Sequence, residues 1–188
     1  RIMAVGNCEP QEESDNDRLS GELVPIISRD QFDDEAEKFL SRYCPEALDS
    51  PMRIPIEMIA SDMKLQVIED VPLSDNLTFF GNVLDKHRKI TIRNAKRGTV
   101  YLDPRVSYER SVGTKRTTLA HECFHWHRHQ PYHVLMKMIG ANDNLGKAIQ
   151  CQIAANTTDS DKWKAVDWME WQAKGVAPRI LMPAKTTR

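Results

Sequence analysis

The sequence predicts an α+β fold, with helices before and after a small, mostly antiparallel sheet. Apolar residues recur at helical spacing between residues 30 and 43. Short runs rich in Val, Ile, Thr and Phe, separated by polar turns, follow between residues 65 and 102. Helical periodicity returns after Pro104 and continues towards the end of the sequence. This order of helices, strands and helices is typical of an α+β domain.

Length and composition predict one ordinary globular domain. The 188 residues are 40% hydrophobic and 28% charged, which is enough to bury a core. The formal net charge of −1 gives no electrostatic reason to expect nucleic acid or an anionic membrane as the main partner. No apolar run approaches the ~20 residues that span a bilayer. The four cysteines lack CxxC spacing and suit a reduced protein, so we expect a cytoplasmic location.

The chain is expected to divide into a lead-in and a single domain. Residues 1–28 are expected to be a flexible lead-in, because residues 9–18 are polar, mostly acidic and without apolar periodicity. Residues 29–188 are expected to form the domain. Within it, residues 131–157 are expected to be a helical or loop segment.

Caps, prolines and periodicity predict the individual elements. Asp30 is expected to cap a first helix that stops near Pro45, and a second short helix is expected from Pro55 to Met63. Later helices are expected at about residues 114–129 and 161–174. Because the connections between the strands are too short for helical crossovers, the sheet is expected to be mostly antiparallel. The expected strands are residues 65–69, 77–84, 89–93 and 99–102.

Residues 121–125 of the first later helix read His-Glu-Cys-Phe-His, an HExxH motif. Residues four apart share a helix face, so His121 and His125 can take two corners of a tetrahedral zinc site. Glu122 lies about 100° round the axis from His121 and can take a proton from a water that the ion activates. It can then deliver that proton to a leaving amine. The motif predicts a hydrolytic zinc site with Glu122 as catalytic base; the alternative is a surface helix with several histidines.

A hydrolytic zinc site needs a third protein ligand. The extended metzincin motif requires glycine and histidine where this chain has Arg128 and Pro131, so that class is excluded. Glu170 is the only glutamate in the 63 residues after His125 and lies in a helical-looking stretch, which makes it the expected third ligand. Asp167, one turn earlier, competes as a ligand or as a partner of a ligating histidine.

The neighbouring residues are expected to have supporting roles. His129 lies about 12 Å along the axis from His121, too far to share an ion with both motif histidines, so it and His133 are interpreted as supporting or surface groups. His127 points elsewhere, and Cys123 faces away from the metal as a buried structural thiol. Three tryptophans are expected to pack in the core or between helices: Trp163, Trp168 and Trp171.

On ligand type, zinc is preferred over iron or manganese as the metal. The sequence leaves open which substrate is hydrolysed and which residue stabilises the oxyanion. The candidates for stabilising a tetrahedral oxyanion are Tyr108, Arg110, Arg116, Arg179 and His129.

Two longer signatures carry a family resemblance. The first comprises residues 100–104, the pair Glu109-Arg110 and residues 116–125, which include the HExxH motif. The second comprises residues 170–177 and the ending Leu181-Met182-Pro183. With both signatures, residues 65–183 resemble the ImmA/IrrE metallopeptidases.

The resemblance implies a zincin-like domain in which His121, His125 and Glu170 hold Zn2+ and Glu122 is the catalytic acid/base. Members of this family are typically cytosolic proteins of bacteria, phages and mobile elements, and some cleave a partner transcriptional repressor. We therefore expect a zinc-dependent endopeptidase with a specific protein substrate, such as a helix-turn-helix repressor. Direct contact with nucleic acid or a membrane is not expected.

The chain departs from the family pattern in three places. Phe124 stands where glycine is common, and Lys174 and Val176 stand where asparagine and phenylalanine are usual. The connection from His125 to Glu170 is longer than usual, so residues 131–160 are interpreted as an insertion that acts as a lid or a partner-binding element. Phe124 favours one alternative, a regulatory or sensor module that keeps the fold but acts by binding a partner. A metallohydrolase acting on another amide is a further alternative.

Overall fold

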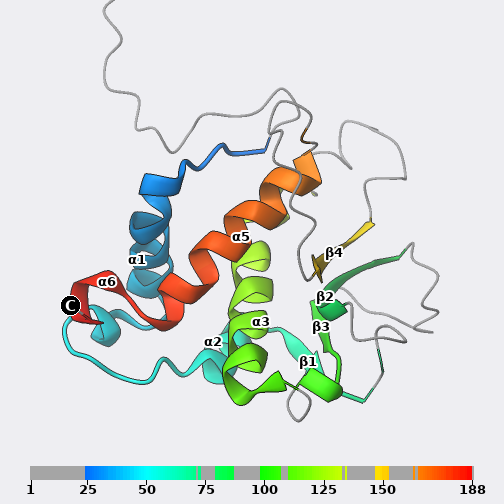
Figure 1. Cartoon of the computed structure of the whole chain (residues 1–188), viewed down its shortest axis with the longest axis horizontal. Helices are drawn as coiled ribbons and strands as arrows, with labels where there is room; N and C mark the ends of the chain where they lie inside the picture. The colour runs from blue at the N-terminus through cyan, green and yellow to red at the C-terminus, as the bar shows by residue number, and fades with distance from the viewer. Residues whose placement is uncertain are drawn as a thin grey trace, which may run out of the picture.

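Helices and one small sheet form an α+β fold, seen in a computed structural model that describes residues 24–70, 72, 79–86, 98–106, 110–132, 134, 147–152, 163 and 165–187 (Figure 1). The helices are α1 (Phe32–Tyr43), α2 (Ile56–Asp62), α3 (Val112–Phe124), α5 (Ala165–Leu181) and α6 (Ala184–Thr187). The strands are β1 (Gln66–Ile68), β2 (Phe79–Lys86), β3 (Thr99–Leu102) and β4 (Lys147–Gln152). Shorter helical turns are η2 (Arg29–Gln31), η3 (Pro45–Leu48) and the π-helical η5 (His125–His129).

The strands lie in the order β1-β3-β2-β4. β2 pairs antiparallel with both β3 and β4, whereas β1 and β3 are parallel. The expected sheet is mostly antiparallel, and the β1–β3 pair is the part that departs from this expectation. β2 follows β1 in the chain but lies on the far side of β3, so β3 lies between these two strands, antiparallel to β2 and parallel to β1. The expected strand at residues 89–93 lies outside the described residues.

β4 corrects a second expectation. It falls in the segment expected to be helical or loop, yet it pairs with β2 in a register that sets Gln150 opposite Asn82 and Ile149 opposite Val83. Part of residues 131–160 therefore belongs to the sheet. The interpretation of this segment as an insertion stays a prediction, because most of it lies outside the described residues.

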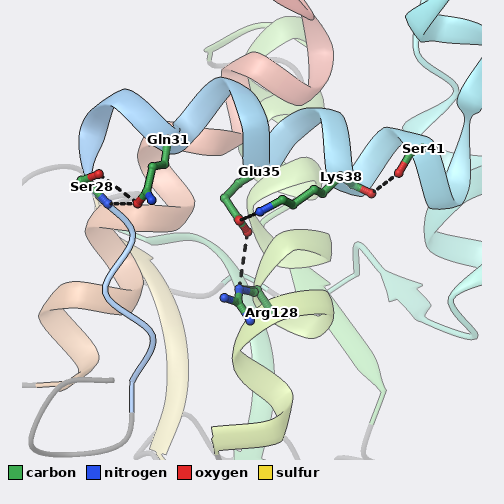
Figure 2. Close-up of polar contacts among 6 residues, drawn as sticks. All are labelled: Ser28, Gln31, Glu35, Lys38, Ser41 and Arg128. Carbon is green, nitrogen blue, oxygen red and sulfur yellow. Dashed lines mark hydrogen bonds and ion pairs between the residues drawn. The ribbon is translucent and has the colours of Figure 1, made fainter. Parts of the chain in front are cut away.

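The start of α1 is capped differently from the prediction. The Ser28 backbone N–H and its hydroxyl both donate to Gln31 Oε1, at 2.8 and 2.9 Å (Figure 2). Ser28 is the N-cap of the η2 turn, which leads into α1; Asp30 lies inside that turn, and the N-cap of α1 itself is Gln31. α1 ends at Tyr43, just before Pro45, as the sequence predicts.

α5 organises the helical layer by packing against both α1 and α3 (Figure 1). The core between these helices includes the fully buried side chains of Phe39, Phe124 and Ile180. Residues 24–28 also pack on the domain, because Val24 and Ile27 are fully buried. In the described part of the chain, no helix is both long and apolar enough to cross a bilayer.

Candidate metal centre

The helix that carries the motif is fixed at its start. The Thr114 backbone N–H donates to the Ser111 hydroxyl at 3.0 Å and so caps α3. Arg116 pairs with Glu57 at 3.1 Å and also donates to the backbone carbonyl of Ile54. These contacts attach the first turns of α3 to α2 and to the loop before it.

The motif side chains face the interior. His121 and Glu122 belong to the last turn of α3, and His125 opens the π-helical turn η5. Their exposed fractions are 2%, 0% and 1%. The π turn replaces the regular α-helical ending expected near residue 129, and π turns are frequent at functional sites.

Glu170 reaches the two histidines from α5. The two Nε2 atoms of His121 and His125 lie 2.9 Å apart, and the Glu170 carboxylate oxygens lie 3.5 Å and 3.4 Å from them. In tetrahedral zinc sites with bonds of about 2.0–2.2 Å, ligand atoms lie about 3.3–3.6 Å apart. The two Glu170 distances match this spacing, whereas the two Nε2 atoms are closer together than it. The ligand atoms of the three residues all lie within 4.8 Å of one another, so the group could hold a metal ion, and we call these residues the metal triangle.

The charge state of Glu170 also suits a cation. Its side chain is 14% exposed, and burial acts to raise the pKa. The imidazoles of His121 and His125, 3.5 and 3.4 Å from its oxygens, outweigh burial and hold the pKa of Glu170 well below its usual range. Glu170 is thus a carboxylate at neutral pH, which is the form that binds metal ions.

His129 contacts a member of the metal triangle rather than joining it. Its Nδ1 lies 2.8 Å from His125 Nδ1, and its Nε2 lies 2.9 Å from Gln172 Oε1. Gln172 was not singled out in the sequence. The sequence feature that could have identified it is its position: Gln172 is a polar residue in helical register with the apolar Met169 and Val176. Its side chain is fully buried in the structure.

Cys123, His127 and three tryptophans lie in packed surroundings. Cys123 is fully buried, as predicted, and burial raises the pKa of its thiol. His127 packs against Phe39 and Tyr43, and burial together with nearby Arg42 and Arg128 lowers its pKa to about 4. The predicted tryptophans pack against one another, with ring centroids 4.8–5.9 Å apart: Trp163, Trp168 and Trp171.

Asp167 and two of the oxyanion candidates are not part of the metal triangle. Asp167 is exposed and is not part of the group. Two of the oxyanion candidates have other contacts: Arg116 pairs with Glu57, and Arg179 pairs with Asp33 at 2.8 Å. Tyr108 and His133 lie outside the described residues.

Comparisons with protein-family models, with curated proteins and with solved structures found no match. The resemblance to the ImmA/IrrE metallopeptidases therefore stays a prediction. The described residues define an α+β protein in which two helices bring together a group able to hold a metal ion.

Proposed function

We propose that this chain is a zinc-dependent endopeptidase that hydrolyses a specific protein substrate, with Glu122 as general base. The observation that supports it most strongly is the metal triangle of His121, His125 and Glu170. Glu122 follows His121 directly on α3, as hydrolysis by an HExxH site requires.

Zinc suits this donor set. Two neutral imidazoles and one carboxylate, with a fourth position left for water or substrate, are typical of catalytic zinc sites. When bound, the ion supplies Lewis acidity to a carbonyl and brings the pKa of water at the site to about 7.

The chain supplies the proton transfers. Glu122 accepts a proton from the attacking water and returns it to the leaving amine. Its carboxylate is fully buried, and in surroundings of low dielectric its charge interacts strongly with a nearby cation. The same burial limits access of bulk water to the reaction.

The proposed substrate is a helix-turn-helix repressor in the cytoplasm. This step rests on the family resemblance. Among the cysteines whose side chains the structure describes, Cys44 and Cys123 are free and buried.

Metal analysis of purified variants tests the ligand assignment. We expect one zinc per chain in the wild type and in Glu122→Gln, because Glu122 is not a ligand. Glu170→Ala should lose most of the metal. Asp167→Ala is the matched control, since Asp167 lies one turn from Glu170 and is exposed; it should keep the metal. Full zinc retention by Glu170→Ala would remove Glu170 from the site.

Cleavage of a repressor encoded beside the gene tests the activity. Wild-type protein should cut it, and Glu122→Gln, loaded with the same amount of zinc, should be slower by at least about a hundredfold. Equal cleavage by both proteins would exclude Glu122 as the base.

A second candidate function is a regulatory or sensor module that keeps the metal and acts by binding a partner. The near-complete burial of His121, Glu122 and His125 favours it, because an occluded site limits entry of a peptide. Tight repressor binding without cleavage by either the wild type or Glu122→Gln would support this function and contradict the peptidase.

A further inference from the structure

A connected series of polar side chains leads from the metal triangle to the N-terminal end of the domain. His125 Nδ1 lies 2.8 Å from His129 Nδ1, on the opposite side of the His125 ring from the metal triangle. His129 Nε2 lies 2.9 Å from Gln172 Oε1. Gln172 in turn donates its amide N–H to the backbone carbonyl of Pro25. We call His129 and Gln172 the relay.

The hydrogen bonds of the relay run in one consistent direction. If His125 offers the lone pair of Nε2 to a metal, its proton sits on Nδ1 and is donated to His129 Nδ1. His129 then carries its proton on Nε2 and donates it to Gln172 Oε1. The amide group of Gln172 completes the series at Pro25. With neutral imidazoles, each donor thus meets an acceptor only when His125 has the tautomer that binds metal through Nε2.

The surroundings hold the relay in place. His129 and Gln172 are both fully buried. The Phe124 ring packs edge-on against His129, with centroids 5.4 Å apart and the ring planes at 90°. At the far end, Pro25 lies between Val24 and Ile27, which are also fully buried. Neither side chain of the relay has room to exchange its partner for bulk water.

We propose that His129 and Gln172 are positioning residues that fix the ring orientation and tautomer of His125 for metal binding, with the Pro25 carbonyl as the fixed end of the series. This inference deepens the proposed function and rests on it. Partners of metal-bound histidines of this kind typically change metal affinity by about 10- to 100-fold when they are removed.

Zinc affinity, measured by competition with a chelator, tests the proposal without any substrate. His129→Leu and Gln172→Leu should each bind zinc about 10- to 100-fold more weakly than the wild type. Gln172→Glu keeps an acceptor for His129 but loses the donor to the Pro25 carbonyl, so it should bind zinc more tightly than Gln172→Leu, because a carboxylate acceptor raises ligand basicity.

Tyr43→Phe is the matched control. It removes the contact between the Tyr43 hydroxyl and His127 Nδ1 (3.3 Å), which involves η5 but not His125. Its zinc affinity should equal that of the wild type. Circular dichroism of each metal-free variant reports whether the fold is retained.

The outcomes separate the two proposals. If the wild type binds zinc and His129→Leu binds it equally well, the proposed role of the relay is wrong, and the peptidase proposal is unaffected. If the wild type binds no zinc, both the proposed function and the proposed role of the relay are contradicted. A Gln172→Glu variant as weak as Gln172→Leu would contradict the role of the acceptor.

If the leucine variants fail to fold, a measurement on the wild type still tests the proposed role of the relay. In zinc-loaded protein with 15N-labelled histidine, long-range 1H–15N spectra should show the proton of His129 on Nε2 and that of His125 on Nδ1. A proton on Nδ1 of His129 would overturn the relay.

Discussion

Cys123 lies between the two motif histidines in sequence but on another side of the helix. Three successive positions of α3 therefore have different surroundings: His121 faces Glu170, Glu122 is buried beside it, and Cys123 is enclosed by the core. Successive residues of a helix are rotated by about 100°, so neighbours in one motif can face either the metal triangle or the hydrophobic core.

This burial predicts an unreactive thiol at Cys123. Burial, with the nearby charges of Glu122 and Glu57, raises the pKa, so the nucleophilic thiolate is scarce at neutral pH. Native protein treated with iodoacetamide at pH 7.5 should leave the Cys123 peptide unmodified, as measured by mass spectrometry. The same peptide should be labelled in urea. Rapid labelling of the native protein would contradict the described packing.

At the scale of elements, the contact between α1 and α5 depends on one glycine. A Cβ atom added to Gly175 would lie 1.9 Å from the Phe32 ring, which also packs against Trp171 at 4.7 Å. A second contact joins α1 to η5, because Arg128 Nε lies 3.4 Å from the buried Glu35, which also pairs with Lys38 (Figure 2). α1 thus supports α5 and η5, two of the three helical elements that carry the site.

Gly175→Ala should therefore destabilise the fold despite its higher helix propensity. Overpacking costs about 1–3 kcal/mol, which exceeds the gain of about 1 kcal/mol expected from replacing glycine in a helix. Urea denaturation would measure the change in the free energy of unfolding.

Gly113→Ala provides the control, because its added Cβ would meet only the Ser111 hydroxyl at an ordinary 3.5 Å. This variant should lose no stability. A Gly175→Ala protein as stable as Gly113→Ala would show that α1 can move away from α5 without cost.

The helices could be predicted largely from local sequence, whereas parts of the sheet could not. Apolar spacing and Pro45 locate α1, since both signals lie within the helix or next to it. β4 pairs with β2, more than sixty residues earlier, and no local pattern in residues 147–152 indicates that partner. The π-helical turn at residues 125–129 was also missed, because residue types do not reveal a shift to i→i+5 hydrogen bonding.

At the scale of the whole molecule, the metal triangle joins two helices that are distant in sequence. His121 and His125 come from α3 and η5, and Glu170 comes from α5. A ligand that binds only the folded state stabilises it by mass action. Metal occupancy and global stability should therefore be linked.

Removal of zinc should lower the melting temperature. At free zinc one hundred times Kd, the expected stabilisation is about 2.7 kcal/mol. Differential scanning calorimetry with and without a chelator measures the shift, and Glu170→Ala should show little difference between the two conditions. An unchanged melting temperature in zinc-loaded wild type after chelation would contradict the link.

The site was predicted in part. His121, His125 and Glu170 could be found because the motif spacing is local and only one glutamate follows it. The contact between Gln172 and Pro25 joins residues 147 positions apart, and only the packed fold brings them together.

Anomalous diffraction at the zinc edge, from crystals of zinc-loaded wild-type protein, tests the central claim most directly. The account predicts one strong peak within about 2.0–2.2 Å of His121 Nε2, His125 Nε2 and a Glu170 carboxylate oxygen. A peak bound by other residues, or none within reach of these three atoms, would contradict it.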